Sequence, residues 1–179
     1  MKFIQPKHDR WHTIAGEDGP MVTLTPAPHS LLTLVQWHGT RATWPAQMPV
    51  GVALANDADV ATLAADLPRL SLVALHFPKW TDGRAYSQAR VLRTRLRYAG
   101  ELRATGEVLV DMVPLLARTG FDTAALRADQ SRESAERALS FIPAYYQGDV
   151  QQPRPAFARP ADELKSAFEP DFVQQGASI

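Results

Sequence analysis

Between residues 49 and 147, short apolar runs alternate with stretches of helical periodicity. The runs, nearly all apolar or β-branched, are residues 50–55, 72–77, 102–105 and 121–126. Such runs are typical of parallel strands covered on both faces. The stretches between them predict helices over residues 60–67, 85–98, 107–118 and 131–146. Four β–α units in series predict an α/β fold with a mostly parallel sheet and right-handed crossovers. Four strands cannot close a barrel alone, which favours an open sheet or a homodimer across a sheet edge.

The two flanking segments have a different pattern. Residues 1–48 combine turn formers with short β-like runs, the clearest over residues 31–37, and predict a short β-rich segment packed on the main domain, with a hairpin. Residues 148–179 are interrupted by prolines and predict an irregular tail with one short helix over residues 161–168. The aromatic residues of this tail are Phe157, Phe168 and Phe172. They either dock on the body or a partner, or belong to a frayed terminus.

Composition narrows the classes of function. The 179 residues include 19 basic and 19 acidic side chains and no cysteine. Zero net charge argues against a general polyanion binder, so we expect no nucleic-acid partner. Without cysteine there is no disulfide, thiolate metal ligand or cysteine nucleophile, and no metal site is expected. No apolar stretch is long enough to span a bilayer and the N-terminus has no signal-peptide core, which predicts a soluble cytoplasmic protein with no membrane association.

The zero total conceals an uneven distribution of charge. Residues 79–103 contain seven basic and two acidic side chains, a local net charge of +5. Most are arginines, whose planar fork suits carboxylate, phosphate or sulfur oxyanions. On the predicted helix, Tyr86, Arg90, Arg93 and Arg97 form a stripe beside the apolar one. This stripe is either a solvated face with ion pairs to neighbouring helices or a surface that binds an oxyanion or a partner.

Two loops at strand ends carry the candidate binding residues. Ligands bind at the carboxyl edge of open α/β sheets, and these loops lie there in the predicted fold. The first loop and the helix after it contain Lys79, Asp82, Gly83, Arg84 and Ser87. The second strand end and the helix after it contain Arg103, Thr105, Gly106, Glu107 and Asp111. The alternative is a pair of well-capped turns with surface charges.

The residues of these loops are compatible with more than one chemistry. If the strands are adjacent, Asp82 and Glu107 form an acid–base pair or bind a hard cation, or instead neutralise the arginines and lock the loops. His76, at a strand end, is expected to be a structural histidine rather than a catalytic one. The sequence has no dinucleotide fingerprint, P-loop, zinc-protease or nucleophile-elbow motif, so the cofactor is unknown.

One continuous stretch resembles a known family. From Phe77 to Asp111 the chain reads FPKWTDGRAYSQARVLRTRLRYAGELRATGEVLVD, and Gly120-Phe121-Asp122 follows. These phrases, within residues 50–147, resemble a family of small bacterial proteins classed as a domain of unknown function. Family genes commonly lie beside the sulfite reductase gene, and members are labelled oxidoreductases of sulfite reduction. Three positions depart from the family pattern: Ala85 replaces a usual glycine, Glu107 an aspartate and Thr119 a cysteine.

Two hypotheses of different class follow. The resemblance implies an accessory protein of assimilatory sulfite reduction, acting as a partner of sulfite reductase or as an oxidoreductase component. The residues alone suggest a small protein or enzyme that binds an oxyanion or phosphate ligand through the loops around Asp82–Arg84 and Arg103–Glu107. The two hypotheses differ in whether the candidate residues converge on one cavity or are spread over a docking surface.

Overall fold

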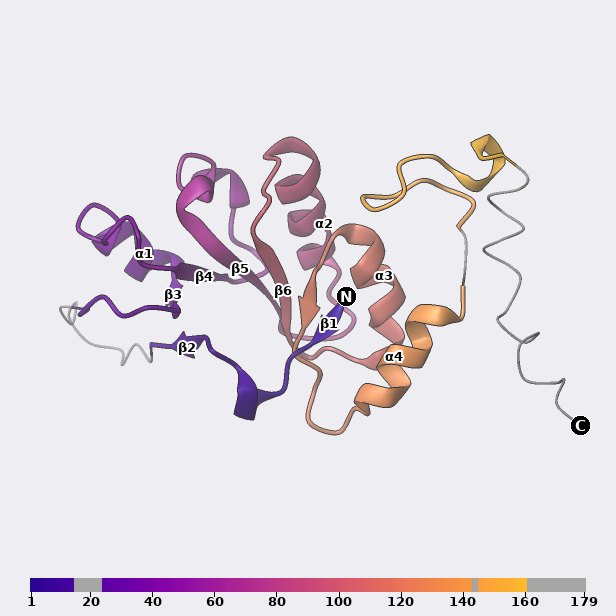
Figure 1. Cartoon of the computed structure of the whole chain (residues 1–179), viewed down its shortest axis with the longest axis horizontal. Coiled ribbons are helices and arrows are strands. Elements are labelled where there is room, and N and C mark those ends of the chain that lie inside the picture. Colours follow the sequence, from indigo (N-terminus) through magenta and orange to yellow (C-terminus); the bar gives the residue numbers. More distant parts are fainter. Residues whose placement is uncertain (15–23, 143–144, 161–179) are drawn as a thin grey trace, which may run out of the picture.

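A parallel sheet with helices packed along one side forms the body of the protein (Figure 1). The computed structural model describes residues 1–14, 24–142 and 145–160. The strands are β1 (Lys2–Phe3), β2 (His12–Thr13), β3 (Ser30–Thr33), β4 (Val50–Leu54), β5 (Leu70–Phe77), β6 (Glu101–Gly106) and β7 (Thr123–Ala124). The α-helices are α1 (Leu34–Thr40), α2 (Arg84–Arg90), α3 (Val113–Thr119) and α4 (Arg132–Ser140). The predicted α/β class and parallel sheet are confirmed.

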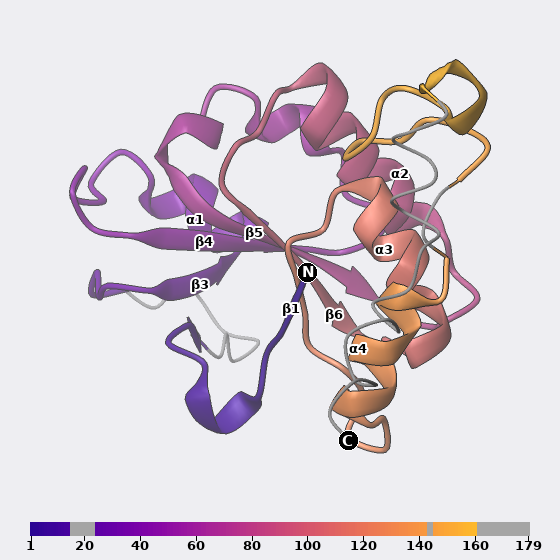
Figure 2. The ribbon, with the colours of Figure 1, turned by 45° about the vertical axis from the view of Figure 1, so that its right-hand side comes forward.

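The order of the strands shows that the sheet curls. The described residues form a seven-stranded sheet in the order β1-β7-β6-β5-β4-β3-β2, with every neighbouring pair parallel. β1 and β2 therefore lie at opposite edges, although only residues 4–11 separate them in the chain. Such a short connection spans the two edges only if they approach each other. Figure 2 shows this segment, in indigo, looping from β1 toward β3.

The N-terminal residues join the main sheet instead of forming a hairpin. β1 pairs with β7, β2 with β3, and β3 with β4, all in parallel, so the predicted hairpin is wrong. The apolar run predicted over residues 31–37 also divides, because Thr33 ends β3 and begins α1. Its hydroxyl accepts a hydrogen bond from the Gln36 backbone N–H while the Gln36 side chain accepts from the Thr33 N–H, a capping box.

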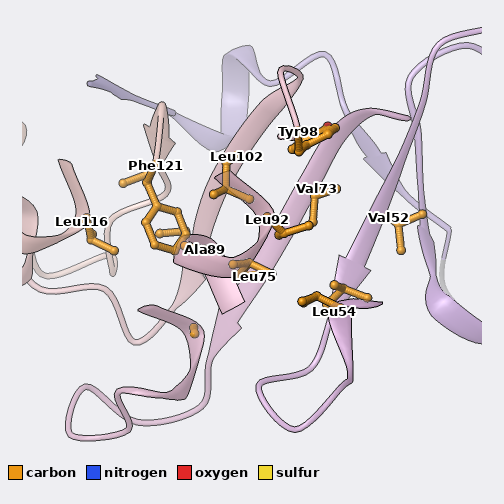
Figure 3. Close-up of a cluster of buried hydrophobic side chains, with 14 of the residues drawn as sticks. Val52, Leu54, Val73, Leu75, Ala89, Leu92, Tyr98, Leu102, Leu116 and Phe121 are labelled. Atoms are coloured by element: carbon orange, nitrogen blue, oxygen red, sulfur yellow. The ribbon is translucent and has the colours of Figure 1, made fainter. Parts of the chain in front are cut away.

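The two faces of the sheet bury different side chains. On the outer face, Val73, Leu75 and Leu102 are buried. They pack against Ala89 of α2 and Leu92 of the turn that continues α2, which together we call the α2 segment (Figure 3). On the opposite face, here called the inner face, Trp11 from the N-terminal segment packs with a smaller cluster that includes Leu72 and Ala74. A Cβ at Gly51 would lie 3.1 Å from the Trp11 ring, which explains why glycine suits this position. The N-terminal segment thus covers part of the inner face.

The predicted helices all differ from the observed ones at their ends. Residues 60–67 form two 3₁₀ turns, Val60–Leu63 and Leu67–Arg69, because Asp59 caps a short turn and Pro68 has no N–H to continue it. After α2, residues Val91–Arg95 form a π-helical turn, and Arg97 takes a φ of 54°. Two further helices are shorter than predicted: a 3₁₀ turn, Val110–Met112, precedes α3, and α4 ends at Ser140. No helix in the described segments is long and apolar enough to cross a membrane.

The strands over residues 49–147 are each found near their predicted positions. The largest change is at residues 121–126, where only Thr123 and Ala124 pair as β7. The C-terminal segment is irregular as far as it is described, with one 3₁₀ turn, Ala156–Ala158. There Phe157 is exposed and lies against Tyr146, with ring centroids 5.3 Å apart. The predicted helix over 161–168, Phe168 and Phe172 lie outside the described residues.

Candidate functional site

The loop between β5 and α2 holds an ion pair between residues that are neighbours in sequence. Arg84 Nη2 donates to Asp82 Oδ2 at 2.7 Å, and Asn56 Nδ2 donates to the same oxygen at 2.6 Å. The hydrogen bonds from Arg84 lower the pKa of Asp82 to about 2, so this carboxylate is ionised at neutral pH. Arg84 therefore already has a carboxylate partner inside the chain.

The same loop and helix also present cations that have no partner. Lys79, Arg90, Arg95 and Arg97 are exposed, and in the described part of the chain their side chains make no hydrogen bond or ion pair. Trp80, beside Lys79, is 58% exposed. Gly83 and Ser87 are exposed as well, and Ser87, Arg90 and Thr94 follow one another at helical spacing. We use the name basic face for these four exposed cations and Trp80, which follow one another along residues 79–97, between the end of β5 and the start of β6.

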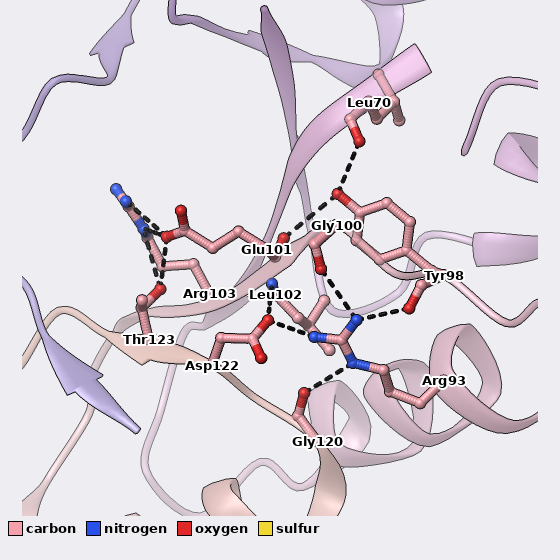
Figure 4. Close-up of polar contacts among 10 residues, drawn as sticks. All are labelled: Leu70, Arg93, Tyr98, Gly100, Glu101, Leu102, Arg103, Gly120, Asp122 and Thr123. Atoms are coloured by element: carbon pink, nitrogen blue, oxygen red, sulfur yellow. Dashed lines mark hydrogen bonds and ion pairs between the residues drawn. The ribbon is translucent and has the colours of Figure 1, made fainter. Parts of the chain in front are cut away.

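The predicted stripe of arginines is therefore divided between surface and interior. Arg93 is turned inward, with its side chain 12% exposed. Its guanidinium donates to the carbonyls of Tyr98, Gly100 and Gly120 at 2.6 to 2.9 Å and pairs with Asp122 (Figure 4). Arg93 thus joins the end of the α2 segment to the starts of β6 and β7, and its role is structural.

The second strand end forms a separate ion-pair cluster. Arg127 Nη1 donates to Glu107 Oε2 at 2.7 Å, and Arg127 Nε donates to Asp129 Oδ1 at 2.6 Å. The hydrogen bond from Arg127 lowers the pKa of Asp129 to about 2, and both carboxylates raise the pKa of Arg127. Glu107 and Asp82 therefore pair with different arginines. In the segments that the structure describes, no three His, Asp or Glu side chains are grouped as metal ligands would be.

Three other candidates lie near this strand end without a common partner. Thr105 Oγ1 donates to the Leu75 carbonyl at 3.3 Å, which ties β6 to β5. Gly106 has a φ of 91°, and a Cβ there would meet the Phe77 carbonyl at 2.4 Å, so glycine serves the turn. Asp111 is exposed. His76 is exposed too, and its side chain makes no hydrogen bond within the described ranges, so the expectation of a structural rather than a catalytic histidine stays a prediction.

Arg103 belongs to a buried network on the inner face. Its side chain is only 4% exposed. Nη1 donates to Asp9 at 2.6 Å and Nη2 donates to Glu101 at 2.8 Å, while Thr123 Oγ1 donates to the same Glu101 oxygen at 2.7 Å. Figure 4 shows the guanidinium and Thr123 converging on this carboxylate. Arg103 therefore lies on the inner face, because Glu101, Arg103 and Thr105 alternate with the core residues of β6.

A cavity of about 660 Å³ opens beside this network. It lies at the amino ends of β1, β6 and β7, where Lys2, Glu101, Asp122 and Thr123 line it together with residues of the N-terminal segment. Arg103 lines this cavity, whereas Lys79, Asp82, Arg84 and Glu107 do not. The structure therefore brings Asp82 and Arg84 together in the loop that also holds Lys79, and it places Arg103 and Glu107 in two separate ion-pair clusters.

Sequence reasoning did not identify the residues around this cavity. Asp9 lies 94 residues from Arg103 in the chain, and no local pattern connects them. In the sequence, Glu101 is an acidic residue of the charged segment and Thr123 is a β-branched residue of a short apolar run, and neither pattern indicates a partner. The alternation of β6 was the one available signal, since it places Glu101 and Arg103 on the same face.

These features define a curled, all-parallel βα protein with a basic helix face and an inner-face cavity. Residues 51–157 match a family described as bacterial protein of unknown function, DUF934. The match covers more than half of the chain, so the protein belongs to this family, as the sequence resemblance indicated. No curated protein matches the chain.

Proposed function

We propose that this protein is a cytoplasmic accessory protein of assimilatory sulfite reduction that binds sulfite reductase through its basic face. The resemblance of the stretch from Phe77 to Asp111 to the family supports a role in sulfite reduction, because family genes commonly lie beside the sulfite reductase gene. Lys79, Trp80, Arg90, Arg95 and Arg97, the residues of the basic face, all belong to this stretch. The resemblance and the unpaired cations thus coincide in the chain.

The observation that carries the docking proposal is the division of the basic residues into two groups. Arg84, Arg93 and Arg103 each pair with a carboxylate of the same chain. In contrast, the four cations of the basic face are exposed and make no ion pair among the residues described. Unpaired cations attract an acidic partner surface and speed its association. Arginine and tryptophan are also enriched in protein interfaces.

The division into paired and unpaired basic residues also favours docking of a partner over binding of an oxyanion at the strand-end loops. That alternative assigns the grip on the anion to Arg84 and Arg103. Arg84 already holds the Asp82 carboxylate, and Arg103 lies in a separate cluster away from these loops. A ligand at the loops would have to compete with Asp82 for Arg84, whereas a partner protein meets the basic face directly.

Co-purification tests the proposal. Tagged protein is recovered from cells at low and at high salt, and sulfite reductase is identified in the eluate. We expect sulfite reductase to co-purify at low salt and to be lost at high salt, because screening weakens an interface built on exposed charges. Absence of sulfite reductase under every salt condition would overturn the proposal.

A pair of single substitutions locates the interface. Arg90→Glu reverses one charge on the basic face, and Lys7→Glu reverses the charge of an exposed lysine in the N-terminal 3₁₀ turn, Pro6–His8. We expect Arg90→Glu to reduce recovery of sulfite reductase strongly and Lys7→Glu to leave it near the wild-type level. Equal losses from both variants would indicate attraction by overall charge rather than docking through this face.

A further inference from the structure

The cavity on the inner face is separate from the basic face and of a different kind. Its volume of about 660 Å³ lies within the range of small-molecule sites, roughly 300–1,000 Å³. It lies at the amino ends of β1, β6 and β7, opposite to the edge where ligands of open α/β sheets usually bind. The N-terminal segment contributes His8, Asp9 and Arg10 to its lining, so the connection between the edge strands β1 and β2 forms part of the wall.

Three basic and three acidic side chains line the cavity, and they differ in whether they are paired. Its three carboxylates are already engaged: Asp9 and Glu101 hold Arg103, and Asp122 pairs with Arg93 and accepts from the Leu102 backbone N–H at 2.8 Å. By contrast, Lys2 and Arg10 are exposed and make no side-chain hydrogen bond or ion pair within the described residues. The Arg10 guanidinium lies 5.9 Å from the centre of the Trp11 ring. Two unpaired cations thus line the cavity, whereas each of its carboxylates is paired with an arginine.

Arg103 adds hydrogen-bond donors that are fixed in place. A guanidinium carries five N–H groups, two on each terminal nitrogen. In the described part of the chain, Nη1 donates only to Asp9, and Nη2 donates only to Glu101. One N–H on each terminal nitrogen therefore has no acceptor, on a side chain that is 4% exposed and lines the cavity. A ligand oxygen in the cavity can accept hydrogen bonds from these N–H groups.

We propose that this cavity binds a small organic anion, a molecule with a phosphate or carboxylate group on an organic body. Lys2, Arg10 and the free N–H groups of Arg103 contact the oxyanion, because charge-assisted hydrogen bonds are the strongest polar contacts that these groups can make. Ile4 and Ala99, which also line the cavity, contact the organic body. This site is independent of sulfite reduction and of the basic face, and either proposal stands if the other fails.

Calorimetric titration of the full chain with three probes tests the site. The probes are adenosine 5′-phosphate, citrate and inorganic phosphate, which separate an organic phosphate, an organic carboxylate and a bare oxyanion. We expect saturable binding of at least one organic probe and weaker binding of inorganic phosphate, which cannot contact the apolar lining. Inorganic phosphate that binds as tightly as both organic probes would overturn the organic-anion assignment, and absence of saturable binding by all three would overturn the site.

Matched variants from one segment place the bound anion. Lys2→Ala and Arg10→Ala remove the free cations, while Lys7→Ala removes an exposed lysine of the same segment that does not line the cavity. We expect Lys2→Ala and Arg10→Ala each to weaken binding by about tenfold or more, and Lys7→Ala to change it little. All three positions are exposed, so the unliganded melting temperatures should match the wild type. Binding that is unaffected by Lys2→Ala and Arg10→Ala would overturn the proposal.

Discussion

The carboxyl and amino ends of the strands carry ion pairs of two different kinds. At the carboxyl ends, Arg84 pairs with Asp82, two residues away, and Arg127 pairs with Asp129, two residues away, and with Glu107. Toward the amino ends, Arg103 is buried and pairs with Glu101, two residues away, and with Asp9, 94 residues away. Local exposed pairs form almost wherever the sequence places them and contribute little. A buried pair between distant segments exists only in the folded chain and depends on every contact that positions it.

Loss of the buried cation should lower the free energy of unfolding most. Arg103→Met leaves Glu101 and Asp9 without their partner, and removing one member of a buried pair costs about 3–5 kcal/mol. Arg84→Met, at the exposed edge, should behave like an ordinary surface substitution. Denaturant unfolding of both variants measures the difference in free energy of unfolding.

A charge-neutral variant sharpens this comparison. Adding Asp9→Asn and Glu101→Gln to Arg103→Met removes the stranded carboxylate charges, and we expect part of the lost stability to return. Equal stabilities of Arg103→Met and Arg84→Met would show that the inner-face network is no more important than the exposed edge.

Substitution of two arginines of one helical segment should change the free energy of unfolding by different amounts. Arg93→Ala removes the donors to three carbonyls and to Asp122, and should lower the free energy of unfolding by about 3 kcal/mol. Arg90→Ala, three residues earlier and exposed, should have almost no effect. Arg93→Lys should restore little, because an ammonium group cannot reproduce the planar fork. Thermal unfolding checks all three, and similar losses for Arg90→Ala and Arg93→Ala would refute the division between surface and interior.

The smallest effect is the pH dependence of the exposed edge. The pKa of Asp82 is lowered from 3.8 to about 2 by the hydrogen bonds from Arg84. Because the pKa is depressed on folding, the stabilising contribution of Asp82 is complete above the unfolded value and is lost as the pH falls through about 2. Asp82→Asn should therefore be slightly less stable than wild type at neutral pH and equal to it near pH 2, with a smaller difference at high salt. Melting temperatures over this range test it, and a difference that persists near pH 2 would assign the effect to another cause.

The parts of the fold that sequence predicted are those that local patterns determine. Ala85, Ala89 and Leu92 recur at helical spacing, and all three are buried against the sheet as expected. The π-helical turn at Val91–Arg95 has no such pattern, and it contains the inward Arg93, whereas the outward Arg90 ends α2. The pairing of β1 with β7 was not predictable either, since two-residue strands have no periodicity to recognise.

For the candidate site, sequence identified the charged segment but not its organisation. The pair of Asp82 and Arg84 was visible because the residues are two apart. The cavity was not, because it is formed by residues from the N-terminal segment and from β6 and β7, which only the curled sheet brings together. Unpaired and paired arginines also look the same in a sequence, and only the folded chain separates the basic face from the interior.

Calorimetric titration of the two purified proteins at low salt tests whether the basic face binds sulfite reductase. We expect saturable binding by the wild type, a dissociation constant about tenfold or more higher for Arg90→Glu, and an unchanged constant for Lys7→Glu. No heat of binding at low salt, or equal constants for the wild type and Arg90→Glu, would contradict the claim.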